Sequence, residues 1–362
     1  MIKISIKSKK KKINKKKHIF RTIIINDNIN QTHLIGYGTY SQVYSPPIPC
    51  IKTDECQEKM SSEYISKVIN KEFAEKEIIG AKLIDTIDPY QEWHVGFPVK
   101  CVPLNNAIKN IPYDKDDCII IYKYGGLTLK EILRNYIKEY INYDTFGIFM
   151  SSMVKYIFKG LQIINSKNIT HLDVSLANIL VDHNFISRLI DFGFTMNIDD
   201  YDNDRETYKD NWITYTQPYM YYTPYMTVLA YLLNNDEFKS VDLDEYFEGY
   251  YNKLTIDHYG KNTNFQSDNI EERRAMCKYI TIPSKDEYVK KCYELVENNK
   301  CHAIIEQSDM FGFGVSISRM LCAFENIIPI NIKDNIVNII KKMTDFNDKT
   351  SYQELYNMLL EI

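Results

Sequence analysis

The stretch that decides the fold is HLDVSLANIL, residues 171–180. It carries the polar side chains of Asp173 and Asn178 in a run that otherwise looks made for a protein core. Burying a carboxylate or an amide costs free energy unless the group is paired or put to use. We therefore interpret this stretch as a turn that carries a functional site.

A second acidic motif, LIDFGF, covers residues 189–194 and places Asp191 18 positions after Asp173. Between the motifs, the runs NILV and SRLI with a polar turn at 182–184 predict two short strands that form a hairpin. The hairpin returns the chain and brings Asp173, Asn178 and Asp191 together. Oxygen ligands of this kind suit Mg²⁺ bound to nucleotide phosphates, with one carboxylate available to orient an attacking hydroxyl.

In these two motifs the chain resembles the eukaryotic protein kinase superfamily, whose HRDxxxxN and DFG signatures they match. The resemblance implies that Asp173 is the catalytic base and that Asn178 and Asp191 hold Mg²⁺. It also implies ATP as the phosphate donor and a protein as the substrate. Two other classes stay open: a pseudokinase or scaffold that binds nucleotide weakly or not at all, and a small-molecule kinase of the aminoglycoside or choline type.

Upstream, the segment GYGTYSQVY at residues 36–44 fits the Gly-rich loop of the family, with Ser41 at the third glycine position. Glycine lets backbone N–H groups approach phosphate without a Cβ in the way. The strand PCIKT at residues 49–53 offers Lys52 as the phosphate-binding lysine, embedded between apolar residues. The presence of this loop and of DFG argues against the small-molecule kinase.

The family uses a helix glutamate to hold the lysine. Glu72, Glu75 and Glu77 are the candidates, and we choose Glu77 because it directly precedes an apolar run. The run IIIYKYGG at residues 119–126 then reads as the last strand of the small lobe and the hinge. The predicted nucleotide-binding residues are Gly36, Tyr37, Gly38, Ser41, Val43, Lys52, Glu77, Tyr122, Lys123 and Tyr124, and the predicted catalytic residues are Asp173, Lys52 and Asn178.

Several positions depart from the family pattern. Leu172 stands where the usual Arg precedes the catalytic Asp, and Ser175 stands where serine/threonine kinases usually carry Lys. Ala177 lacks the Arg typical of tyrosine kinases, so we expect serine/threonine phosphorylation. Because Leu172 supplies no charge, we also expect that phosphorylation of the loop at 194–222 does not switch the enzyme.

The Ala-Pro-Glu anchor of the family corresponds to Thr223-Pro224-Tyr225, with QPY at 217–219 as a rival alignment. Its usual Arg partner is hard to find, and Lys349 lies near the expected place. Further on, SDMFGFGVSISRML resembles the helix whose buried Asp braces the catalytic loop, which points to Asp309. A helix N-cap is the competing role for this residue.

The resemblance implies an α+β, bilobal protein-kinase-like fold, with a small β-rich N-lobe that has one main helix and a larger, mainly helical C-lobe. Apolar periodicity predicts helices over 60–85, 128–139 and 144–165. The domains we expect are a basic tail at 1–21, the N-lobe at 22–121, the hinge at 122–126 and the C-lobe at 127–362, with an insertion at about 231–305 that is helical at 285–305 and offers a site for a partner.

The amino-acid composition limits the classes of protein to which the chain can belong. The chain has 362 residues, 44% apolar and 25% charged, which is typical of a soluble globular protein. No apolar run approaches the ~18 residues of a membrane-spanning helix, and the N-terminus lacks a secretory signal. The eight cysteines show no zinc-binding spacing, so we expect reduced thiols and an intracellular protein of the cytoplasm or nucleus.

Charge is unevenly placed. Residues 1–21 carry nine Lys, one Arg and no acid, so this segment has a charge of +10 and the remaining chain −14, against a net charge of −4. Such a tail is either plain and disordered, or a nuclear-import signal, or an anchor for nucleic acid or an anionic surface. The bias towards Ile, Asn, Lys and Tyr fits an A+T-rich gene, and the chain resembles the divergent serine/threonine-protein kinases of large DNA viruses.

Overall fold

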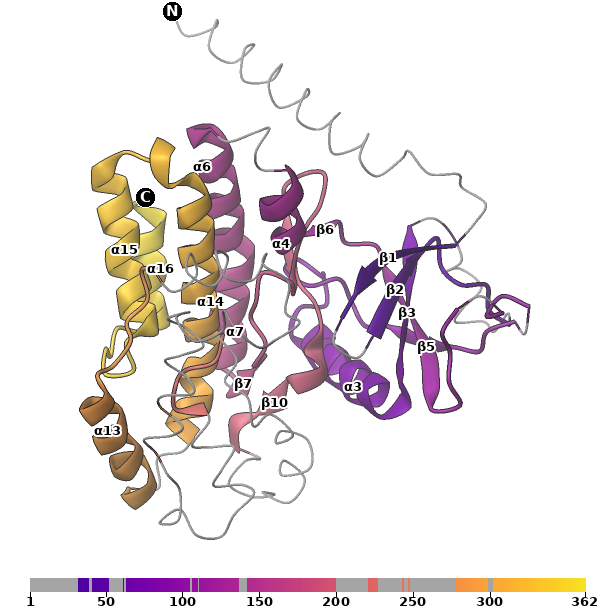
Figure 1. The fold of residues 1–362 in the computed structure, drawn as a ribbon, viewed down its shortest axis with the longest axis horizontal. Helices are drawn as coiled ribbons and strands as arrows, with labels where there is room; N and C mark the ends of the chain where they lie inside the picture. The colour runs from indigo at the N-terminus through magenta and orange to yellow at the C-terminus, as the bar shows by residue number, and fades with distance from the viewer. Residues whose placement is uncertain are drawn as a thin grey trace, which may run out of the picture. The chain divides into compact units, whose positions relative to one another are not determined.

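The structure, a computed structural model, describes residues 32–38, 41–51, 61, 63–104, 106–109, 111–136, 142–199, 221–226, 243, 247, 278–298 and 302–362. The chain divides into two compact units (Figure 1). Unit 1 takes in the described residues up to Leu127 together with Leu180–Arg188, and unit 2 takes in Thr128–Ile179 and Leu189–Ile362. The basic tail and Lys52 lie outside the described residues.

Unit 1 contains a five-stranded antiparallel sheet in the order β1-β2-β3-β5-β4. Its strands are β1 (His33–Tyr37), β2 (Ser41–Ser45), β3 (Tyr64–Asn70), β4 (Val99–Cys101) and β5 (Asp117–Lys123). The central strand β3 pairs with β2 on one side and with β5 on the other, and its residues 66–69 are all buried. The predicted β-rich N-lobe is confirmed.

One long helix, α3 (Lys71–Ile87), follows β3 and packs against β3 and β5 (Figure 1). It begins where the Asn70 side chain accepts a hydrogen bond from the Glu72 N–H, an N-cap that satisfies one of the open donors of the first turn. The predicted helix over 60–85 is therefore wrong for 64–70. The apolar residues of a strand buried on both faces do not alternate, so their spacing in β3 also fits a helix.

Two cysteines of unit 1 are joined. Cys50, in an isolated bridge to Pro103, forms a disulfide with Cys101 at the end of β4. The prediction of reduced thiols is wrong for this pair. The sequence could not reveal the pairing because the two residues lie 51 positions apart and meet only through the sheet.

The chain around the motifs HLDVSLANIL and LIDFGF forms short strands. β6 (Leu127–Thr128), β8 (Ile179–Val181) and β9 (Ser187–Leu189) make a three-stranded sheet in the order β6-β8-β9, and β7 (Ile169–Thr170) pairs with β10 (Met196–Asn197). The predicted strands NILV and SRLI are thus confirmed. The turn between them is held by Asp182, which accepts hydrogen bonds from the N–H groups of Asn184 and Ile186.

Unit 2 is mainly helical, as predicted. Among the described residues its helices are α4 (Leu129–Glu131), η1 (Ile132–Tyr136), α6 (Tyr143–Ser152), η2 (Met153–Phe158), α7 (Lys159–Asn165), η3 (Phe192–Phe194), α13 (Lys285–Glu297), α14 (His302–Phe324), η5 (Glu325–Ile327), α15 (Ile330–Thr344) and α16 (Tyr352–Leu360). α14 packs against α7 and α15, and most of its residues are buried (Figure 1). None of the helices in the described part of the chain is long and apolar enough to cross a membrane.

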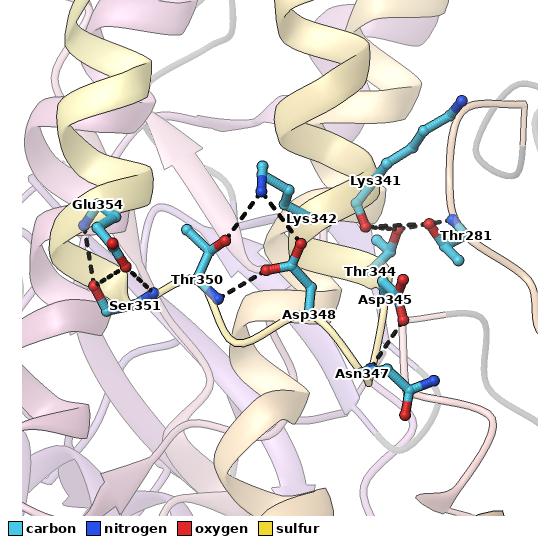
Figure 2. A network of polar contacts seen from close by, with 10 residues as sticks. All are labelled: Thr281, Lys341, Lys342, Thr344, Asp345, Asn347, Asp348, Thr350, Ser351 and Glu354. Atoms are coloured by element: carbon cyan, nitrogen blue, oxygen red, sulfur yellow. Dashed lines mark hydrogen bonds and ion pairs between the residues drawn. The ribbon is translucent and has the colours of Figure 1, made fainter.

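The loop between α15 and α16 is fixed by polar contacts (Figure 2). Lys342 donates to Asp348 and Thr350, and Ser351 with Glu354 forms a capping box at the start of α16. The Thr281 N–H donates to the Thr344 hydroxyl at 2.8 Å, which ties the chain just before α13 to the end of α15.

Candidate active site

A buried ion pair lies between the sheet and the helix of unit 1. The Lys67 ammonium on β3 donates to both carboxylate oxygens of Glu77 on α3, at 2.8 and 2.7 Å. The Tyr122 hydroxyl on β5 donates to the same carboxylate. All three residues are buried, and such a pair is held only when its geometry and hydrogen bonds are good.

The structure places Lys67 against Glu77. We therefore assign to Lys67 the position of the family's phosphate-binding lysine, which the sequence analysis gave to Lys52. Lys67 lies directly opposite Val43 in the β2–β3 ladder, so it faces the strand that leaves the Gly-rich segment. The connection from β2 to β3 spans residues 46–63. The choice of Lys52 assumed a much shorter hairpin, with the lysine only nine residues after Val43. The choice of Glu77 among the three glutamates is consistent with the structure.

The described residues of the Gly-rich segment lie at the end of β1 and in β2. Gly36 is paired with Val43, and the Gly38 N–H donates to the Ser41 carbonyl at 2.8 Å. A Cβ on Gly38 would lie 2.6 Å from the Ser41 hydroxyl oxygen, so the Ser41 side chain would have to move to admit a larger residue there. Ser41 therefore packs into the turn where the family has its third glycine, while Tyr37 is 77% exposed.

The predicted hinge follows β5. The Tyr124 N–H donates to the Glu63 carbonyl at 2.7 Å, so this donor is already used within the protein. Any backbone bond from Tyr124 to a base would therefore have to come from its carbonyl oxygen. Gly126 has φ +112°, a left-handed conformation that favours glycine.

The predicted catalytic loop, which carries Asp173, is braced by Asp309 on α14. Its two carboxylate oxygens accept the backbone N–H groups of His171 and Leu172, both at 2.7 Å. Burial raises the pKa of the Asp309 carboxyl, and the nearby His171 together with the two N–H donors opposes the rise. The predicted bracing role of Asp309 is confirmed, and the N-cap alternative is wrong, since Asp309 lies inside the helix.

The side chains of Asp173 and Asn178 lie in contact. The Asn178 side-chain nitrogen donates to the Asp173 carboxylate at 2.7 Å and to the Asp173 carbonyl at 3.0 Å. With the amide nitrogen committed to Asp173, the Asn178 amide oxygen is the group left for a metal ion. The Asn178 carbonyl in turn accepts the Ile190 N–H at 3.0 Å, which joins the catalytic loop to the DFG segment.

The DFG segment begins in a strained conformation. Asp191 has φ 66° and ψ 66°, the left-handed region that a non-glycine residue adopts only at a cost of roughly 1–3 kcal/mol. The following Phe192 is buried and packs on the His171 ring, with centroids 4.9 Å apart. His171 also contacts the Ile190 carbonyl through Nε2 at 3.0 Å. Strain of this kind clusters at functional sites, where the surrounding structure holds it in place.

Comparison with known proteins identifies the family of this chain. The family model for the protein kinase domain matches residues 29–221, more than half of the chain. The chain belongs to the protein kinase family. A search of the curated proteins finds no match.

In this kinase the segment after the DFG motif ends in an aromatic anchor. Tyr225, at the position of the family's Glu, is buried against the rings of Tyr288 and Phe346, with centroids 5.5 and 4.6 Å away. Burial raises the pKa of the Tyr225 hydroxyl far above its ordinary value, so this side chain is neutral. Lys349, near the expected place of the partner Arg, is exposed and makes no ion pair with the described residues.

The sequence analysis did not identify one residue that contacts Glu77, Lys67, and one further contact to Glu77, from the hydroxyl of Tyr122. The sequence did contain a usable signal for Lys67. This lysine lies in the apolar run YISKVIN, three residues before the N-cap Asn70 and ten residues before Glu77. The contact from Tyr122 had no signal in the sequence, because it depends on the register of β3 with β5.

Proposed function

We propose that this kinase is an active protein kinase that transfers the γ-phosphate of ATP to serine and threonine hydroxyls of protein substrates. The observation that carries the proposal is the buried Lys67–Glu77 ion pair. A domain that no longer handled nucleotide would have no need to keep two charges buried at a cost of several kcal/mol.

Each group has a role in the proposed reaction. Lys67, in place of Lys52, would bind the phosphates together with the backbone of the Gly-rich segment, and Tyr122, Lys123 and Tyr124 would border the base. Asp173 would orient the attacking hydroxyl and accept its proton. Its hydrogen bond from Asn178 supports this role by holding the carboxylate in one orientation.

The donor set of the catalytic loop suits magnesium. The Asn178 amide oxygen and the Asp191 carboxylate are hard oxygen ligands, and Mg²⁺ on a nucleotide needs only one or two protein ligands besides the phosphates. The ion would neutralise charge on the phosphate oxygens as the phosphoryl group is transferred.

Serine/threonine specificity rests on Ala177, which is exposed and lacks the Arg typical of tyrosine kinases. The pseudokinase is the main alternative, and the altered positions Ser41, Leu172 and Ser175 are its support. Location in the cytoplasm or nucleus and a viral source stay predictions, as do a partner on the insertion and binding of nucleic acid or an anionic surface by the tail.

The test is a phosphotransfer assay with Mg-ATP on the kinase itself and on generic basic and acidic proteins, followed by analysis of the phosphorylated residue type. We expect phosphoserine and phosphothreonine. Phosphotyrosine as the main product would contradict the proposed serine/threonine specificity. If the wild type transfers phosphate neither to itself nor to any protein tested, the pseudokinase is favoured.

A further inference from the structure

An apolar cluster surrounds the residue that precedes the proposed catalytic base. We call it the Leu172 cluster. It joins the catalytic loop, the DFG-proximal strand β10, the end of the activation segment (the chain from Asp191 to Met226), α13 and α14. Its buried members are Leu172, Met196, Ile198, Tyr225, Met226, Leu243, Phe247, Tyr288, Cys292, Leu295, Ile304 and Ile305.

Leu172 needs support from this cluster. Its backbone has φ 63°, which is unfavourable for a branched residue and persists only where neighbours hold it. One stabilising contact is the hydrogen bond from the Leu172 N–H to Asp309. The other is the cluster, in which its side chain is 2% exposed. Asp173 follows directly, so whatever fixes Leu172 also fixes the backbone from which the catalytic carboxylate projects.

Both ends of the activation segment enter the same cluster. Met196 and Ile198 follow the DFG motif, and Met196 pairs with Thr170 just before the catalytic loop. Tyr225 and Met226 lie at the far end of the segment. Apolar packing therefore connects Leu172 to the two ends of this segment without any charged group among its members.

Helix α13, from the insertion, closes the cluster. Tyr288, Cys292 and Leu295 are spaced at i, i+4 and i+7, so they lie on one helix face, and all three are buried. The Tyr288 ring is stacked on Tyr225 at 5.5 Å and packs on Phe247 at 5.1 Å. Burial raises the pKa of the Cys292 thiol to about 12, so it packs as a small neutral group.

The helix is itself fixed at its start. Ser284 and Glu287 form a capping box, and the preceding Thr281 donates its N–H to Thr344 and its hydroxyl to the Lys341 carbonyl (Figure 2). α13 is thereby attached to α15 and presents Tyr288 to the activation segment from a supported position.

We propose that Tyr288 of the insertion is a positioning residue for phosphoryl transfer: by packing on Tyr225 it holds the Leu172 cluster together and sets the backbone at Asp173. In this kinase, a permanent apolar support stands where the Arg before the catalytic Asp would otherwise bind a loop phosphate. The inference rests on the proposed function for its effect on turnover, but not for its effect on the order of the catalytic loop.

The experiment compares Tyr288→Leu and Tyr288→Phe with a matched control, Phe324→Leu. Phe324 is also a fully buried ring of unit 2, packed on Phe146 and outside the Leu172 cluster. The measurements are kcat and KM for ATP, the melting temperature, and hydrogen–deuterium exchange of the peptide that spans 169–176. The exchange measurement needs no activity.

For Tyr288→Leu we expect kcat to fall about tenfold or more, KM for ATP to stay within about twofold, and the catalytic-loop amides to exchange faster. Tyr288→Phe keeps the ring and should behave like the wild type. Phe324→Leu should lower the melting temperature comparably while leaving kcat and the exchange of this peptide unchanged. If Tyr288→Leu does not fold, Cys292→Ala, a smaller loss on the same helix face, should show the same changes at lower amplitude.

Equal effects of Tyr288→Leu and Phe324→Leu on kcat and exchange would overturn the inference, because both would then act only through global stability. If the wild type transfers no phosphate, the proposed function fails, and the exchange data alone decide the positioning role. Unchanged exchange of the 169–176 peptide in Tyr288→Leu, or in Cys292→Ala where the former does not fold, would refute it.

Discussion

Lys67 and Glu77 are joined by two hydrogen bonds, at 2.8 and 2.7 Å, between the central strand of the sheet and the buried face of α3. The Tyr122 hydroxyl adds a third hydrogen bond to the same carboxylate. These hydrogen bonds hold the lysine ammonium in one place from within the protein. Groups that are pre-organised in this way lose less entropy when they act on a substrate.

The first prediction separates the two lysines. Lys67→Met should reduce phosphotransfer by orders of magnitude, whereas Lys52→Met should leave it within about twofold. Lys67→Met also leaves the Glu77 carboxylate buried without its cation, so we expect a loss of stability on the order of 3–5 kcal/mol, which denaturant unfolding would measure. Double substitution with Glu77→Gln should recover part of this stability. If Lys52→Met and not Lys67→Met abolished transfer, our assignment would be wrong.

The second prediction concerns the catalytic base. Asp173→Asn should cut turnover by orders of magnitude while ATP affinity stays nearly intact, because the role that is lost belongs to the transition state. Steady-state kinetics and nucleotide titration measure the two quantities separately. An Asp173→Asn protein with near wild-type turnover would remove Asp173 from the mechanism.

The third prediction concerns nucleotide and metal. Mg-ATP should raise the melting temperature, since a ligand that binds only the folded state stabilises it by RT ln(1 + [L]/Kd). Asp191→Ala should remove the Mg-dependent part of that shift, which is the difference between melting curves with ATP alone and with Mg-ATP. If no nucleotide shifts the melting temperature of the wild type, the pseudokinase alternative would be favoured.

These predictions rest on residues that were not equally visible in the sequence. Asp173, Asn178 and Asp191 could be found because they follow one another along the chain in a recognisable spacing. Lys67 was harder to place, because four successive residues of β3, 66–69, are buried, so the apolar residues of this strand show no alternation and their spacing also fits a helix.

The aromatic anchor was hidden for a different reason. Tyr225 and Tyr288 are 63 positions apart by residue number and meet only by packing, which leaves no local pattern. The sequence did indicate that the Glu–Arg ion pair of the family had been replaced. It could not indicate that rings, including one from the insertion, take its place. Packing between distant segments depends on the whole fold and is not readable from spacing.

The fourth prediction restores the family's Arg. Leu172→Arg puts a charge into a cluster whose buried members are all uncharged, so it should destabilise the fold by on the order of 3 kcal/mol. Leu172→Met, which nearly conserves volume, should cost less than about 1.5 kcal/mol and serves as the control. Thermal and denaturant unfolding of the two variants would measure the difference. A stable, active Leu172→Arg protein would show that the site can accept a charge and would weaken the role we give to the cluster.

The last prediction concerns regulation. Thr195, Thr207 and Tyr208 are hydroxyl acceptors in the segment after the DFG motif, of which only Thr195 lies within the described residues. A phosphate there would lack the usual Arg partner, because Leu172 is apolar and buried in a cluster that already joins both ends of the segment. The many acids at 199–206 would also repel added negative charge. Phosphatase treatment should therefore leave activity within about a factor of two, which corresponds to about 0.4 kcal/mol in the barrier. A large fall in activity on dephosphorylation, reversed by rephosphorylation at one of these residues but absent from its Ala or Phe variant, would show that a loop phosphate does find a partner.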